Sequence, residues 1–200
     1  MKKLFLIVSL LYISIFNLRC SSQPVNADLE QVFKKIPDDE YKKIMNQYTL
    51  NDKKYSGFYN EYDVSITMIG TVVTEALLQR EGYFLQWSSG KAQSEREKAL
   101  QKLSSTSEFF ISMFTPTVAH NDLNKGNSMW KVVLEVNGQR YEAEISKFDK
   151  NLVQTQNLFP HYTRFSKGYV ARFNVPMTSI ESGKCVIILT SSLGSSTFRF

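Results

Sequence analysis

The chain has 200 residues, of which 42% are hydrophobic and 13% aromatic, so it can bury one sizeable core and is neither disordered nor collagen-like. Its formal net charge is +5, but Lys2, Lys3 and Arg19 lie in a segment that we expect to be cleaved off, and subtracting these 3 charges leaves +2. This weak charge argues against a nucleic-acid-binding protein, and two cysteines with two histidines exclude a disulfide-rich scaffold and a four-cysteine zinc site.

The first 19 residues are typical of a signal peptide. Met1-Lys2-Lys3 is a short basic start, and residues 4–16 are a run of 13 residues interrupted only by Ser9 and Ser14. A helix that spans a bilayer needs roughly 20 apolar residues, so this run is too short to cross one. We therefore expect residues 1–19 to be an export signal.

A single cysteine follows this run directly. In Asn17-Leu18-Arg19-Cys20-Ser21-Ser22, Cys20 lies where cleavage is expected. The arrangement resembles the signal and lipobox of bacterial lipoproteins, in the looser spirochaetal form, because Asn17 and Arg19 stand where the usual pattern has Leu and a small residue. The resemblance covers about a tenth of the chain. It implies that Cys20 begins the mature chain and carries acyl groups, and that Ser21 directs the protein to the outer membrane. A plain secreted protein and an uncleaved anchor are the alternatives.

The mature chain would begin with a short lipidated tether at residues 20–25, which spans at most about 20 Å when fully extended. Residues 26–52 predict a helical segment in which a first helix ends at Pro37 and a second begins at Asp38. The apolar residues at helical spacing are Leu29, Val32, Phe33 and Ile36 in the first helix, and Tyr41, Ile44, Met45 and Tyr48 in the second.

Residues 53–200 predict one β-rich domain with a helical insertion. Apolar residues alternate with polar ones over about residues 62–69, as in a strand. The insertion spans about residues 71–103, with a break at Gly82. Within it Ser94 is followed three residues later by a glutamate, which is the pattern of a capping box at a helix start.

The clearest local signal is a hairpin within residues 129–146. Asn137-Gly138 lies between two alternating segments and favours a two-residue type I′ turn, in which the numbers of opposed residues sum to 275. The predicted pairs are Trp130 with Ile145, Val132 with Ala143 and Leu134 with Tyr141 on one face, and Lys131 with Glu144 and Glu135 with Arg140 on the other.

Further strands are predicted over residues 109–114, 169–175, 184–190 and 197–200. Five or six strands joined by short turns predict an antiparallel β-sandwich, so the expected fold class is α+β, with N-terminal helices and a helical insertion. Trp130 on an early strand, followed later by a Tyr-x-Ala-x-Phe strand, is similar in pattern to Ig-like envelope domains, although their paired cysteines are missing. Such a likeness implies nothing about function.

Few residues suggest catalysis or metal binding. His120 and Asp122 lie in a polar loop and His161 follows Phe159-Pro160, and no Gly-x-Ser-x-Gly or other nucleophile context accompanies them. We therefore assign no catalytic residue, no metal ligand and no cofactor, and an envelope hydrolase is the weaker alternative. Cys185 lies in an apolar strand, which favours a buried small hydrophobic residue over a nucleophile.

The remaining candidate is an aromatic cluster around a Pro-containing loop, formed by Phe159, Tyr162, Phe165 and Tyr169. These side chains predict either an exposed recognition patch or core packing. The sequence as a whole favours a lipid-anchored envelope protein whose domain binds or scaffolds a protein partner without catalysing a reaction. A small-ligand carrier, with an apolar cavity between the helices and the sheet, is the alternative.

Overall fold

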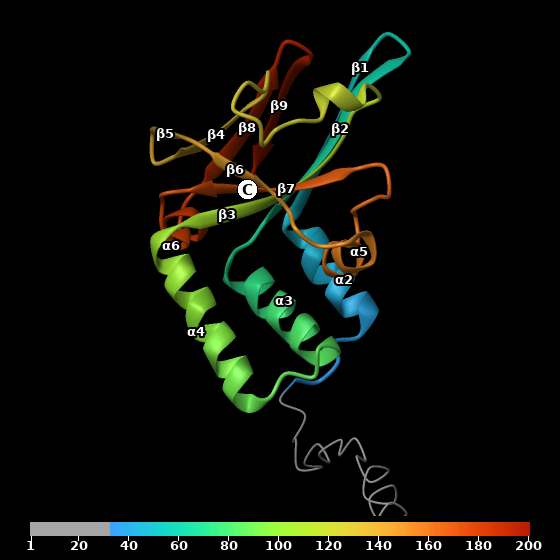
Figure 1. The fold of residues 1–200 in the computed structure, drawn as a ribbon. Coiled ribbons are helices and arrows are strands. Elements are labelled where there is room, and N and C mark those ends of the chain that lie inside the picture. The colour runs from blue at the N-terminus through green and yellow to red at the C-terminus, as the bar shows by residue number, and fades with distance from the viewer. Residues whose placement is uncertain (1–32) are drawn as a thin grey trace, which may run out of the picture. The chain divides into compact units, whose positions relative to one another are not determined.

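The structure is a computed structural model that describes residues 33–200. Two antiparallel β-sheets pack against each other, and helices cover the outer face of the first sheet (Figure 1). The predicted α+β fold with a β-sandwich is confirmed. The predicted signal peptide, Cys20 and the tether lie outside the described residues.

Nine strands and six helical segments make up the described chain. The first sheet has the order β1-β2-β3-β7-β6 and the second the order β5-β4-β8-β9. The strands are β1 (Thr49–Ser56), β2 (Tyr59–Met68), β3 (Ser107–Phe114), β4 (Lys131–Val136), β5 (Gln139–Glu142), β6 (Glu144–Lys147), β7 (Lys167–Phe173), β8 (Cys185–Ser191) and β9 (Gly194–Arg199). The helices are α2 (Asp38–Gln47), α3 (Thr71–Phe84), α4 (Ser89–Ser105), the 3₁₀ turn η1 (Val118–His120), α5 (Leu152–Leu158) and α6 (Met177–Glu181).

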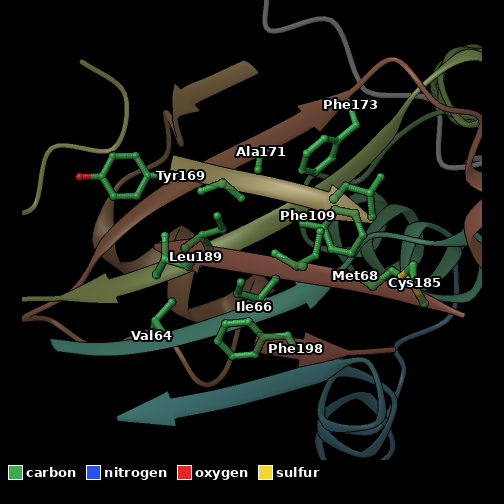
Figure 2. Packing of buried hydrophobic residues seen from close by; sticks show 14 of the residues in the cluster. Val64, Ile66, Met68, Phe109, Tyr169, Ala171, Phe173, Cys185, Leu189 and Phe198 are labelled. Carbon is green, nitrogen blue, oxygen red and sulfur yellow. The ribbon is translucent and has the colours of Figure 1, made fainter. Parts of the chain in front are cut away.

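The main hydrophobic core lies between the two sheets (Figure 2). Alternate residues of each strand point into it, as the two-residue period of a strand requires. The first sheet contributes Tyr62, Val64, Ile66, Met68, Phe109, Ile111, Met113, Tyr169, Ala171 and Phe173, and the second contributes Val132, Leu134, Val136, Cys185, Ile187, Leu189 and Phe198. All of these residues are buried.

A second, smaller core lies between the helices and the outer face of the first sheet. Phe110 on β3 is its centre, and its ring stacks on Phe159 with the ring centroids 3.7 Å apart. Tyr41 and Met45 of α2 are fully buried in the same cluster, and the Tyr41 hydroxyl donates a hydrogen bond of 2.7 Å to the Leu158 carbonyl. Strand β3 is therefore covered on both faces, which explains why seven of its eight residues are buried.

The predicted hairpin register is confirmed from Val133 to Glu142, where every pair sums to 275. The prediction is wrong beyond Ala143, because the chain leaves the second sheet there and β6 pairs with β7 of the first. Glu144 consequently lies opposite Arg172, and Lys131 forms its ion pair with Glu142. The predicted pairs Trp130 with Ile145 and Lys131 with Glu144 do not form.

The helical predictions also need correction. Residues 33–37 are not helical, and the earlier part of the predicted first helix lies outside the described residues. Residues 49–52, expected to be part of the helical segment, belong to strand β1, whose polar sequence concealed it. Helix α4 begins at Ser89, with Ser88 as its N-cap, so Ser94 lies inside the helix and the predicted capping box is wrong. Helices α5 and α6 were not predicted.

Helix α3 continues through Gly82, where the missing side chain makes room for two aromatic rings. A Cβ atom at Gly82 would lie 2.4 Å from the Phe33 ring and 3.1 Å from the Trp87 ring. The helix ends in a Schellman motif, in which Gln86 has a φ of 51° and the Trp87 N–H donates to the Gly82 carbonyl over 3.0 Å. This turn folds Trp87 back over Gly82, and Phe33, the first described residue, packs against both.

Candidate binding surfaces

The predicted aromatic patch is wrong as an exposed surface. Phe159 and Tyr169 are each only 1% exposed and lie on opposite faces of the first sheet. Tyr169 points between the sheets (Figure 2), and its hydroxyl donates to the Asn121 carbonyl over 2.9 Å. Tyr162 is partly buried beside Phe159, which leaves only Phe165 on the surface. Phe159 directly follows helix α5 and lies on the helical side of the sheet, whereas Tyr169 lies on β7 and points to the other side, so residues close in the sequence are separated.

The loop residues considered for catalysis fill structural positions. The His120 carbonyl accepts a hydrogen bond of 2.6 Å from the Trp130 indole N–H, and Asp122 accepts one of 2.9 Å from Ser128. His161 packs against Phe110, and burial lowers the pKa of its imidazole to about 4, so the ring is neutral at pH 7. Across residues 33–200, no three His, Cys, Asp or Glu side chains are grouped closely enough to hold a metal ion.

Cys185 begins β8 and is 1% exposed in the core between the sheets. Burial raises the pKa of its thiol to about 11. Because the thiolate is the reactive form, this cysteine is unreactive in the folded domain. Its expected role as a buried small hydrophobic residue is confirmed.

An exposed aromatic group at the tip of the β1–β2 hairpin escaped the sequence analysis. The two-residue loop is Gly57-Phe58, and Gly57 has a φ of 61°, as the first loop residue of a type II′ turn does. Phe58 is fully exposed, and Tyr55 and Tyr59 beside it are 54% and 57% exposed. These three residues, called the hairpin tip below, stand at the far end of a long hairpin (Figure 1). The sequence signal that could have indicated an exposed aromatic residue at a turn is Gly57 followed directly by Phe58.

A cleft of about 290 Å³ opens between helices α3 and α4 and the outer face of the first sheet. Its apolar walls include Leu77, Leu78, Ala99, Leu103, Phe148 and Val170. Two groups of charged side chains line the cleft. In the first, the Glu108 carboxylate, with only 11% of its side chain exposed, accepts hydrogen bonds from Lys102 over 2.7 Å and from Arg172 over 2.9 Å. In the second, Lys150 forms an ion pair with Glu81 over 2.5 Å. An apolar cavity between helices and sheet is the feature that a small-ligand carrier requires.

Comparisons with known proteins give no relative for this chain. No family model matches it, and neither a curated protein nor a solved structure does. Within the part of the chain that the structure describes, no helix is long and apolar enough to cross a bilayer.

Proposed function

We propose that this protein is an exported, lipid-anchored protein of the cell envelope whose domain binds another protein and does not catalyse a reaction. The basic start, the short apolar run and the cysteine behind it support the anchor at Cys20. Two or three acyl chains give stable attachment to a membrane, whereas a single chain is marginal. The serine at position 21 favours the outer membrane, by the sorting logic of the lipoproteins that the N-terminus resembles.

The observation that carries the binding role is the exposure of the hairpin tip. Aromatic side chains are enriched at protein interfaces, where they bury a large area and lose few rotamers. An isolated exposed apolar residue is ordinary, but three neighbouring aromatic residues at the end of a protruding hairpin are not. The partner expected from this chemistry is a protein with an apolar pocket that accepts Phe58.

The position of the hairpin tip suits a protein held at its N-terminal end. Strand β2 leads from Tyr59 at the tip to Met68, and α3 then continues away from the sheet to the place where Phe33 packs (Figure 1). The described chain thus begins at the opposite end of the domain from the hairpin tip.

The binding role is tested by photo-crosslinking in intact cells. Phe58 is replaced by photoreactive benzoylphenylalanine, and the same residue is placed at Gln139, which is exposed beside the turn of the β4–β5 hairpin, as the matched control. We expect one discrete protein adduct from position 58 and none from position 139. Equal adducts from both positions, or lipid adducts alone, would contradict a protein partner at the hairpin tip.

The anchor is tested by measuring the mass of the N-terminal peptide from native membranes, with Cys20→Ser as the control. We expect a peptide that begins at Cys20 with added acyl mass, and the loss of that mass in the variant. An unmodified N-terminus would instead make the protein a soluble exported one. If the anchor is present, protease treatment of intact cells separates a surface-exposed domain from one that faces the periplasm.

A further inference from the structure

The cleft between α3, α4 and the first sheet has the composition of a binding site for a small molecule. Ligand pockets usually have volumes of about 300–1,000 Å³, apolar walls and a few placed polar groups. At about 290 Å³ the cleft lies at the small end of that range, and apolar side chains from both helices and from the sheet form its walls. A compact ligand with an apolar body fits these dimensions.

The charges in the cleft favour an anionic group on that ligand. Three cations line the cleft, Lys102, Lys150 and Arg172, against two carboxylates, Glu81 and Glu108. Lys150 and Glu81 neutralise each other, whereas Lys102 and Arg172 share the single charge of Glu108, each on a different oxygen. Among the residues that line the cleft, one positive charge is therefore left over at the Glu108 end; Glu144, opposite Arg172 on β6, is exposed and forms no ion pair with it.

Arg172 also has hydrogen-bond donors that are not used within the domain. Its Nε donates a hydrogen bond to Glu108. Its two terminal nitrogens donate no hydrogen bond to any residue in the described range, 33–200. These nitrogens can hold a carboxylate with two parallel bonds, a geometry for which arginine is better suited than lysine. Glu108 is nearly buried and fixes the position of the guanidinium, so the donors are held in place before a ligand arrives.

We propose that this cleft binds a small anionic amphiphile, with its carboxylate at Arg172 and Lys102 and its apolar chain or ring among the side chains of α3 and α4. The site is separate from the hairpin tip and does not depend on a protein partner. It adds a ligand to a domain whose proposed role is binding.

The test is calorimetric titration of the full chain carrying Cys20→Ser, which has no acyl group, with decanoate and with decylammonium at pH 7. We expect decanoate to bind with one-to-one stoichiometry and decylammonium to bind at least ten-fold more weakly. Ala99→Trp fills the cleft and should abolish decanoate binding, which separates this site from any other apolar part of the chain.

Two further variants locate the anionic group. Arg172→Met leaves Glu108 paired with Lys102 and should weaken decanoate binding about ten-fold, while decylammonium is unaffected. Lys131→Met removes an exposed cation from the other sheet and should change neither. Phe58→Ser should also leave decanoate binding intact, so that failure of the proposed partner site is distinguishable. The proposal is overturned if decanoate does not bind, if both probes bind equally, or if Ala99→Trp leaves binding unchanged.

Discussion

The two faces of the first sheet differ in how completely they are closed. Between the sheets, apolar side chains meet without an intervening charge, and Leu134, Ile187 and Leu189 are fully buried. On the helical face, Phe110 stacks on Phe159, but the cleft and two groups of ion pairs lie beside this contact. One face of the sheet thus holds the fold together, while the other leaves space beside the helices.

The largest expected effect contrasts the same truncation on the two faces. Leu134→Ala in the closed core should lower the free energy of unfolding by about 3–4 kcal/mol, because it removes buried contacts and leaves a cavity. Leu77→Ala on the wall of the cleft should cost only about 1 kcal/mol, because this side chain is already partly exposed. Urea denaturation of both variants measures the difference, and equal losses would contradict it.

A pH dependence should arise on the helical face, from His161. Its pKa is about 4 in the folded protein, because of burial, against an ordinary value of 6.5, so the unfolded chain binds the proton more readily. Stability is then complete above about pH 6.5 and falls as the pH drops toward 4, by up to about 3 kcal/mol. Denaturation at several pH values should show this slope, and His161→Gln should flatten it. A slope that persists in the variant would assign it to other groups.

The packing of Phe33 on Gly82 can be tested with a double-mutant cycle. Gly82→Ala should destabilise the domain by about 1–2 kcal/mol, because the new Cβ would lie 2.4 Å from the Phe33 ring, although alanine is the better helix former. In a Phe33→Ala background this penalty should fall by at least about 1 kcal/mol, measured by thermal unfolding. Additive effects of the two changes would show that the residues are not in contact.

The smallest effect is expected at the hairpin tip. Phe58→Ser should change the free energy of unfolding by less than about 0.5 kcal/mol, because the side chain is fully exposed. Tyr62→Phe, four residues further along the same hairpin, should cost about 1 kcal/mol, since it removes the buried hydrogen bond to Ser196. A large loss from Phe58→Ser, measured by the same denaturation, would mean that the tip packs against the domain.

The closed core was predictable from the sequence, because two-residue alternation identifies the buried face of a strand. The register around Asn137-Gly138 followed from that pattern, and the burial of Cys185 followed from the apolar run around it; both are confirmed. The switch between sheets at Ala143 was not predictable, since the pairing of Ile145 with Ala171 depends on a strand far along the chain. An apolar cavity between the helices and the sheet was expected for a ligand carrier, but its charged residues were not, because they come together from distant segments. The hairpin tip was missed because the sequence does not show which aromatic side chains stay exposed. Glu108 and Arg172, for example, are 64 residues apart.

The covalent path between the start of the described chain and the hairpin tip has a mechanical consequence. From Phe33 to Phe58 it passes through only two elements, α2 and then β1. A load applied between Phe33 and Phe58 would be carried along these residues. Strand β1 is already extended, so α2 is the element that can lengthen, by about 20 Å for its ten residues. The hydrogen bond from Tyr41 to Leu158 and the burial of Tyr41 and Met45 would resist this lengthening.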